Sequence, residues 1–379
     1  MIESQISRGP AFQWFARFVV GIAILLVWWG AATTTKQAGM VFADWPLSLG
    51  TVNPPGWLEH MIPFLEHSHR LLAKLVGVLV LVLFSWAYVR NGRRALEVAG
   101  IVVLLAVVLG FYIAAGSERF DVMAKQRLLL IAAGLSILPV GWLVWSWRSR
   151  GWDPVQKLTA LALLMVTTQA IFGGLRVTEI SNAFAVIHGC FAQCFFCVLI
   201  LIVMVSAPGW RNAGFTVSRE LLGRSRKAGV LLVGLVLMQL IFGASMRHFH
   251  RHALPDDGLF LTQGRWIPSF EDPMIAMLFL HKFTAFSVFF FVLGMALTLG
   301  GGTGNPALRR LSTPGRHALA ILILLCLQIS LGLLVIGTSK SFWVTNVHVL
   351  NGLVILALSF VFAVRAIRGR DVDGLQAVS

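Results

Sequence analysis

The sequence predicts an all-α membrane protein that crosses the bilayer many times. Of its 379 residues, 57% are hydrophobic and only 12% are charged, and the mean hydropathy is +0.81. A water-soluble domain would need more charged surface than this. Apolar runs recur along the whole chain, and about 20 helical residues at ~1.5 Å each are enough to cross a bilayer. We therefore expect about ten transmembrane helices and no soluble domain.

The expected spans follow the apolar runs, at 12–34, 66–89, 95–115, 127–147, 156–175, 182–206, 228–246, 273–299, 317–338 and 343–366. The first run is too long, and too poor in small residues at its end, to be a removed signal peptide. Of the 31 Lys and Arg residues, 19 fall on one set of alternate loops and 9 on the other. That excess marks the cytoplasmic side and predicts that both termini lie there. Topology and contact with anionic lipid therefore explain the net charge of +15, and nucleic acid is not an expected partner.

A polar stretch, Glu66-His67-Ser68-His69-Arg70, lies where the second run begins. Ionisable groups at the head of a membrane helix are functional candidates, although an interfacial helix start that stays in water would look the same. Glu66 and His69 are three residues apart and share one helix face. Three other histidines each lie a few residues into their own run, at His188, His281 and His348. In the predicted topology all four lie near the outer face, where they can form two facing pairs.

The two halves of the chain resemble each other. A glutamine, a glycine four residues later and then a histidine occur twice, as Gln169, Gly173 and His188 and as Gln328, Gly332 and His348. The spacing of the histidine pairs differs by 52 residues between the halves, which matches the two runs at about 95–148. We therefore predict an eight-helix core of two pseudo-symmetric four-helix bundles, 1–94 with 149–210 and 211–379, and an inserted helical hairpin at 95–148.

Histidines spread one to a helix favour haem over other metal groups. Two imidazoles that face each other across an apolar bundle can supply both axial ligands of a haem iron. Zinc and copper sites need three or four ligands that converge on one point. Each histidine alone could instead form a hydrogen bond with a neighbouring helix. Four basic residues could pair with haem propionates or serve as interfacial anchors, namely Arg70, Arg176, Arg247 and Lys282.

Other polar residues are less informative. Cys190, Cys194 and Cys197 have an iron–sulfur spacing, but on one continuous helix they form a stripe that cannot surround a cluster, so we expect core thiols. Three histidines alternate in an outer loop and fit either a metal site or a solvated loop, namely His248, His250 and His252. The runs 43–46 and 254–257 could form roofs over two sites. The sequence assigns no role to His60 or His67.

Several of these pieces together resemble the haem A synthase family. They are Glu66-His67-Ser68-His69-Arg70, Asp44-Trp45-Pro46, the stretch 169–177 with His188-Gly189, Gly243 to His248, His281-Lys282, and His348 with Asn351-Gly352. The resemblance covers most of the chain outside 95–148 and implies oxidation of the C8 methyl of haem O to a formyl group, which gives haem A. It implies a multi-pass protein of the bacterial cytoplasmic membrane.

The family pattern also implies roles for individual residues. His69 and His188 would ligate the substrate haem, with Arg70 and Arg176 beside it, and Glu66 would act in catalysis. His281 and His348 would ligate a resident haem b, with Lys282 and Arg247 nearby. A carboxylate half-buried against apolar rings can exchange protons near neutral pH. Implied partners are haem O, a haem O synthase, terminal-oxidase assembly factors, membrane lipid and a second copy of the chain.

This sequence departs from the family pattern in three places, one of which is the extra hairpin at 95–148, and two other functions stay open. The outer loop after the first run lacks the cysteine pair of many members, which excludes a thiol-based electron route there, and Lys282 stands where Arg is common. A dihaem cytochrome that only transfers electrons, or a haem carrier without catalysis, would use the same histidines. The absence of a second carboxylate like Glu66 beside His281 favours an enzyme with one reactive site.

Overall fold

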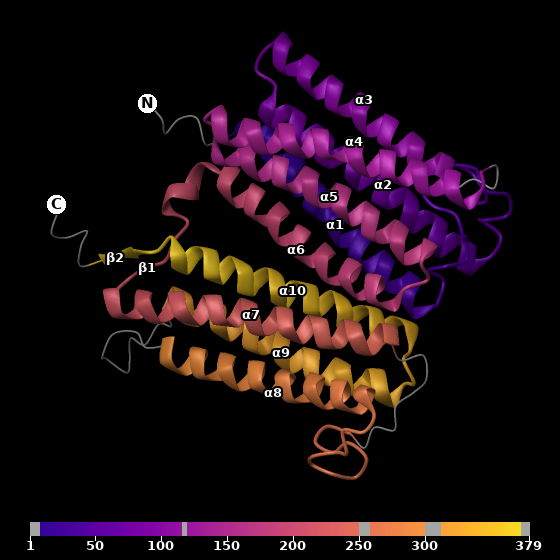
Figure 1. Ribbon diagram of the computed structural model, residues 1–379. Coiled ribbons are helices and arrows are strands. Elements are labelled where there is room, and N and C mark those ends of the chain that lie inside the picture. The colour runs from indigo at the N-terminus through magenta and orange to yellow at the C-terminus, as the bar shows by residue number, and fades with distance from the viewer. Residues whose placement is uncertain (1–7, 116–119, 250–257, 300–311, 373–379) are drawn as a thin grey trace. The chain divides into compact units, whose positions relative to one another are not determined.

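The protein is described here by a computed structural model that covers residues 8–115, 120–249, 258–299 and 312–372 (Figure 1). Within these ranges ten helices are long and apolar enough to cross a membrane. Their bounds are α1 Pro10–Thr35, α2 Met61–Tyr88, α3 Gly92–Ala115, α4 Val122–Ser149, α5 Pro154–Thr178, α6 Asn182–Ser206, α7 Arg219–Phe249, α8 Pro273–Leu299, α9 Thr313–Gly337 and α10 Phe342–Ile367. The predicted fold class is confirmed, and the chain is a multi-pass membrane protein.

Three helices begin at least five residues before their apolar runs, and one of them is α4, which starts at Val122 rather than at residue 127. Helix α2 starts at Met61 rather than at residue 66, and α7 starts at Arg219 rather than at residue 228. Hydropathy marks only the apolar part of a helix, whereas backbone hydrogen bonding continues through polar residues at the interface. The Glu66–Arg70 stretch therefore lies in the second and third turns of α2 and not at its mouth.

The first compact unit, residues 1–207, contains a ring of four helices. Helix α1 packs against α2, α2 against α5, α5 against α6, and α6 against α1. The caps of α5 and α6 are set by Asp153, which forms a capping box with Gln156, and by Ser181, which accepts a hydrogen bond from the Phe184 amide.

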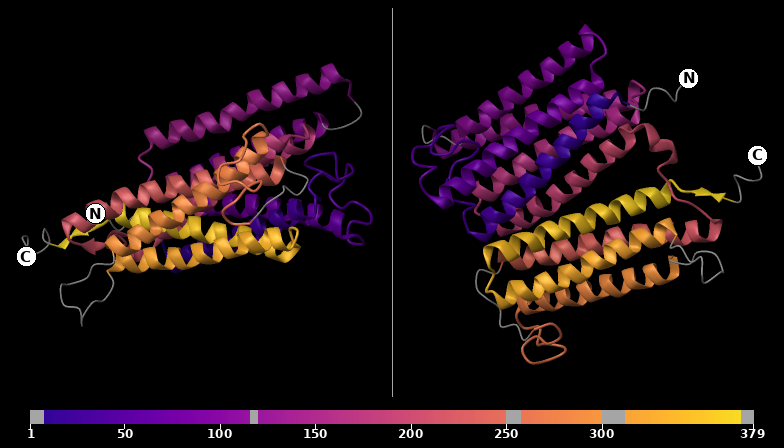
Figure 2. Two further views of the ribbon diagram at one scale, coloured as in Figure 1. Left: turned by 90° about the horizontal axis from the view of Figure 1, so that it is seen from below. Right: turned by 180° about the vertical axis from the view of Figure 1, so that it is seen from behind.

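The hairpin of α3 and α4 lies along one side of this ring, as Figures 1 and 2 show. The two helices pack mainly against each other and touch α2 and α5 only slightly. At one end the hairpin is fastened by Glu97, whose carboxylate accepts hydrogen bonds from Tyr88 and from Arg150, the latter at 2.7 Å. At the other end the rings of Trp45 and Tyr112 meet edge to face at 6.2 Å.

The second compact unit, residues 208–379, repeats the ring with α7, α8, α9 and α10, each in contact with the next and α10 with α7. Helices α1, α2, α5 and α6 thus correspond in order to α7, α8, α9 and α10. A short 3-10 helix, η2 Pro208–Asn212, leads into the strand β1 Thr216–Val217. This strand pairs in parallel with β2 Arg370–Asp371, just after the end of α10.

Candidate functional site

In unit 1 the contact of α1 with α2 positions His69. The Trp29 indole donates a 2.7 Å hydrogen bond to the Ser68 hydroxyl, and Thr33 donates to the Leu65 carbonyl at 3.2 Å. The His69 ring lies against Gly30 of α1, where a Cβ would stand only 2.9 Å from its Cε1 atom. Any larger residue at Gly30 would therefore displace the ring.

His188 is held by α5 through a reciprocal pair of hydrogen bonds with Gln169. The Gln169 amide donates to the His188 carbonyl at 2.9 Å, and His188 Nδ1 lies 3.1 Å from the Gln169 carbonyl oxygen. Because a carbonyl only accepts, Nδ1 carries the proton, and the Nε2 lone pair is free for a metal. The ring also lies against Gly173, where a Cβ would stand 3.1 Å from Cε1.

The structure brings the predicted residues of this site together. The charges of His188, Arg176 and Arg70 all act on His69, and the charge of Glu66 acts on Arg176. The Arg176 guanidinium lies against the backbone of Gly39, where a Cβ would stand 3.1 Å from Cζ. Among the described residues, none accepts a hydrogen bond from this guanidinium, and no carboxylate forms an ion pair with it. Arg176 is thus a cation beside the histidine pair with its donors available.

Glu66 and Arg70 are engaged instead with the loop between α1 and α2. They form a buried ion pair at 2.6 Å, with side chains 4% and 8% exposed. The other Glu66 oxygen accepts hydrogen bonds from the amides of Val41 and Phe42, at 2.6 and 3.2 Å. Arg70 donates to three loop carbonyls, those of Phe42, Asp44 and Leu47, at 2.5–2.8 Å. This pair holds the predicted roof, residues 43–46, in place.

Lys282 of α8 makes the corresponding contacts in unit 2. Its Nζ donates to the carbonyls of Gly258 and Leu261, at 2.7 and 2.8 Å. At the position that corresponds to Glu66, three residues before the histidine, α8 carries the buried Leu278. Arg70 and Lys282, which were expected beside propionates, therefore both direct their donors to the loop that precedes their helix.

The histidine pair of unit 2 is contacted by two glutamine side chains. The Gln239 amide lies 3.1 Å from Nδ1 of His281, and the Gln328 amide lies 3.2 Å from Nε2 of His348. Thr284 donates to the Gln239 side-chain oxygen, which fixes that amide. The Asn351 side-chain amide donates to the Gln328 side-chain oxygen at 2.7 Å, which fixes the Gln328 amide.

The charges of the two unit 2 histidines interact, and Arg247 acts on His348. The glycines of α7 and α9 repeat the pattern of unit 1. A Cβ at Gly243 would stand 3.0 Å from the Cε1 of His281, and one at Gly332 would stand 3.5 Å from that of His348.

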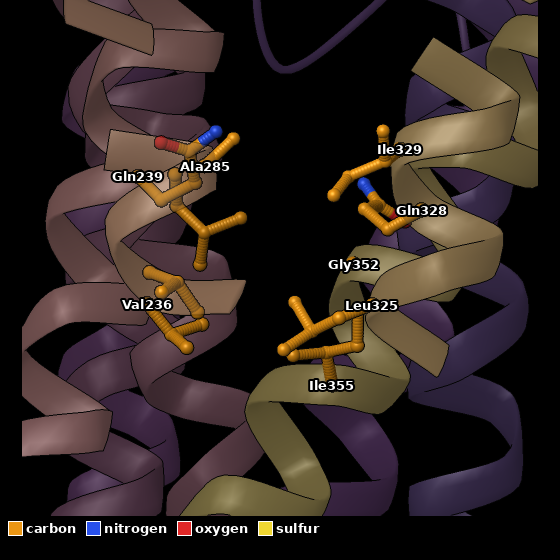
Figure 3. Close-up of a pocket in the computed structure, with 10 residues that line it drawn as sticks. Val236, Gln239, Ala285, Leu325, Gln328, Ile329, Gly352 and Ile355 are labelled. Atoms are coloured by element: carbon orange, nitrogen blue, oxygen red, sulfur yellow. The ribbon is translucent and has the colours of Figure 1, made fainter. Parts of the chain in front are cut away.

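A cavity of about 60 Å³ lies between the four helices of unit 2 (Figure 3). Both glutamine side chains line it, one from α7 and one from α9, and the remaining lining is apolar apart from the glycine backbone, with Val236, Leu240, Ala285, Val288, Leu325, Ile329, Gly352 and Ile355. The histidine-contacting amides and an apolar space thus meet inside this bundle.

Comparison with known proteins supports one family. Residues 126–360 match the model of the COX15-CtaA family, described as cytochrome oxidase assembly protein. The chain belongs to the COX15-CtaA family. It is 25% identical to the haem A synthase of Bartonella quintana over 90% of this chain and 87% of that protein. It is 27% identical to that of Beijerinckia indica over 64% of this chain and 86% of that protein. The match to that of Halalkalibacterium halodurans, also 27% identical, covers 33% of this chain and 41% of that protein.

The residues of this COX15-CtaA member fit a haem in both bundles. Each of the four histidines lies against a glycine of a neighbouring helix and remains only partly buried. The Nδ1 atoms of His69 and His348 are buried and have no hydrogen-bond partner in the described part of the chain. His188 presents a free Nε2 lone pair. At His348 an iron bond through Nε2 would replace the contact with Gln328.

Other sequence-predicted candidates lie elsewhere. Cys190, Cys194 and Cys197 are free thiols along α6, and no three metal-binding side chains converge in the part of the chain that the structure describes. His248 ends α7, whereas His250, His252 and the run 254–257 lie outside the described residues. His67 lies in α2 and contacts the Ser48 hydroxyl of the α1–α2 loop at 3.0 Å.

Sequence reasoning missed Gln239 and Thr284. The signal for Gln239 was present, because Gln239 precedes Gly243 by the same four residues as in the two recognised glutamine–glycine pairs. Thr284 carried no such signal, since a threonine three residues after a histidine is ordinary in a membrane helix. Only the packing of α7 against α8 reveals its contact.

Proposed function

We propose that this protein is a haem A synthase, an oxidoreductase that converts the C8 methyl of haem O to a formyl group. The proposal rests on one observation beyond family membership. Among the described residues, unit 1 alone combines a histidine pair with a buried carboxylate, Glu66, and with a cation whose donors are available, Arg176. Unit 2 has a histidine pair without that carboxylate. One bundle is therefore equipped to act on its haem, and the other only to hold one.

In unit 1, His69 and His188 would hold the iron of the substrate, and Arg176 would bind a propionate. An arginine guanidinium forms strong charge-assisted hydrogen bonds with carboxylates. Glu66 lies one turn from His69 on the same face of α2, so its charge reaches the rim of a haem that His69 binds. Because Arg70 and two loop amides fix it there, Glu66 supplies a negative charge at a set position, where it stabilises positive charge that develops on the substrate.

In unit 2, His281 and His348 would hold a resident haem b, which supplies electron transfer when bound. The chain's own contribution would be to orient the His281 ring through the contact of Gln239 with its Nδ1 and to exclude water with apolar side chains. The basic-residue pattern supports placement in the bacterial cytoplasmic membrane with both termini inside. Haem O synthase and terminal-oxidase assembly factors would then be the functional partners.

The test is co-expression with a haem O synthase, followed by haem extraction and mass analysis. We expect wild-type protein to yield haem A. Glu66→Gln keeps the size of the side chain but removes its charge, so haem O or a hydroxylated intermediate should accumulate while the low-spin haem of unit 2 stays. Arg93→Gln is the matched control, because Arg93 is 86% exposed near the start of α3.

The outcome separates the enzyme from its alternatives. A wild-type protein that retains two haems but makes no haem A would identify a dihaem electron-transfer cytochrome. Release of unmodified haem O to an acceptor would identify a carrier. Normal haem A production by Glu66→Gln would keep the enzyme and remove the electrostatic role of Glu66.

A further inference from the structure

A second cavity in unit 2 lies away from the histidines, where α10 ends. Its volume is about 190 Å³, and its lining is Arg211, Asn212, Gly214, Thr216, Arg368 and Arg370. Three of the six residues are arginines, and none is acidic. These residues come from η2, from β1 and from the segment after α10, so two distant parts of the sequence form the cavity.

Backbone hydrogen bonds build this cavity firmly. The Arg370 amide donates to the Phe215 carbonyl at 2.8 Å, and the Phe215 amide donates to the Arg365 carbonyl at 3.0 Å. Gly214 lies so close to the Arg368 backbone that a Cβ would collide with it. The Arg365 side chain adds a 3.0 Å hydrogen bond to the Ala213 carbonyl. The arginines are therefore displayed from a defined scaffold.

The Arg368 guanidinium has hydrogen-bonding capacity left. It stacks on Trp210, 4.0 Å from the ring centroid, and its Nε is buried without a partner among the described residues. Burial, and then the nearby charge of Arg370, lower the pKa of Arg368. In the described part of the chain neither arginine forms an ion pair with a carboxylate. Asp371, which follows Arg370 in β2, does not line the cavity.

The end of α10 would by itself repel an anion, because the carbonyl groups of a helix C-terminus carry partial negative charge. Here Arg226 offsets that charge. Its side chain donates to the carbonyls of Ala366 and Gly369, at 3.2 and 3.1 Å. The end of the helix is thus neutralised from one side. Arg370 donates one hydrogen bond, at 3.0 Å, to the Arg211 carbonyl, and its other donors remain with those of Arg368 to act on a ligand.

We propose that this cavity binds a phosphate group, and that its source is the head group of an anionic phospholipid. Guanidinium groups match phosphate oxygens in charge and geometry. The cavity lies at the ends of the transmembrane helices α7 and α10, at the level of lipid head groups. Trp210 is of the residue type that concentrates at this interface, and basic pockets at helix ends are suited to such lipids. A soluble phosphate ion would use the same donors.

The full-length protein is tested by native mass spectrometry after exchange into micelles that contain either phosphatidylglycerol or phosphatidylcholine. We expect retention of phosphatidylglycerol and not of phosphatidylcholine. Arg368→Gln and Arg370→Gln should each weaken retention about tenfold, the effect of losing one hydrogen bond to a charged group. Arg224→Gln removes the same charge from α7, where Arg224 pairs with Glu220 outside the cavity, and should change retention less than about twofold.

Two further measurements decide the source and guard against misfolding. Inorganic phosphate is titrated by calorimetry into delipidated protein, and saturable binding of phosphate without retention of phosphatidylglycerol would overturn the lipid assignment. Arg368→Lys keeps the charge and should retain most binding. Equal losses in Arg368→Lys and Arg368→Gln, or equal effects of Arg224→Gln and Arg370→Gln, would show that the cavity does not recognise phosphate.

Discussion

Replacing Arg70 with methionine tests whether a single cation holds the roof of the unit 1 site. Methionine keeps the length and apolar character of the side chain but removes all of its donors. The change leaves Glu66 without its ion-pair partner at 3% exposure. It also leaves the carbonyls of Phe42, Asp44 and Leu47 without the hydrogen bonds that Arg70 donates.

The expected cost is large because the pair is buried. Removing one partner of a buried ion pair costs about 3–5 kcal/mol. At ~1.4 kcal/mol for each factor of ten, the population of molecules with an open loop should rise by about two to almost four orders of magnitude. The transmembrane helices should stay folded, because their apolar contacts do not depend on Arg70. The effect should therefore be local.

Hydrogen exchange of the loop amides measures this opening. Val41 and Phe42 donate to Glu66, so their amide protection reports on the ion pair directly. The amides of Val155 and Gln156, which donate to Asp153 at the start of α5, lie outside the loop and serve as internal references. Arg70→Lys should give an intermediate result.

Unit 2 supports that intermediate expectation, since a single lysine nitrogen holds two loop carbonyls there. Arg93→Met, at a side chain that is 86% exposed, controls for loss of charge. Unchanged protection of Val41 and Phe42 in Arg70→Met would refute the role of Arg70 in holding the roof.

Three further outcomes are expected. His281→Ala and His348→Ala should each remove the low-spin haem signal from optical spectra and leave membrane insertion intact; an unchanged spectrum in both would contradict the ligand assignment. Gly243→Val should displace the His281 ring and reduce haem content, whereas Gly234→Val on the same helix, with open space around its Cβ, should not; equal haem content in the two variants would show that ring placement is not limiting. A variant in which a short linker replaces residues 95–148 should keep haem in both bundles, because α3 and α4 contribute no histidine. If this variant folds but binds no haem, the hairpin is part of the haem-binding core.

The main features of the fold could be predicted because an uninterrupted run of apolar residues indicates a membrane helix. All ten helices were expected, and the pattern of histidines and glutamine–glycine pairs indicated two similar bundles with a hairpin between their parts. The starts of α2, α4 and α7 were missed because polar interfacial residues extend a helix without raising its hydropathy. Charge patterns alone do not mark that boundary.

The candidate site was less accessible to sequence reasoning. Motif spacing identified the histidines. The contacts of a long side chain such as that of Arg70 depend on the path of the preceding loop, which the spacing does not reveal. The sequence left Arg70 and Lys282 open as propionate partners or as interfacial anchors, and it gave no sign of the loop carbonyls to which both donate. Arg176, which looked equivalent to Arg70 in the sequence, is the cation that keeps its donors available. Contacts between helices, such as that of Thr284 with Gln239, leave no periodic trace.

The position of the hairpin also has a consequence for the order in which the protein is made. Arg70 contacts carbonyls only 23–28 residues earlier, so the roof can close as soon as α2 is in place. His188 leaves the ribosome only after the 24 and 28 residues of α3 and α4. At a synthesis rate of about 5–20 residues per second, these two helices add on the order of 3–10 s before the ring of unit 1 can be completed. Unit 2 has no such delay. During biogenesis the loop between α1 and α2 can therefore fold while the first bundle still lacks α5 and α6. This incomplete state lasts longer for the first bundle than for the second.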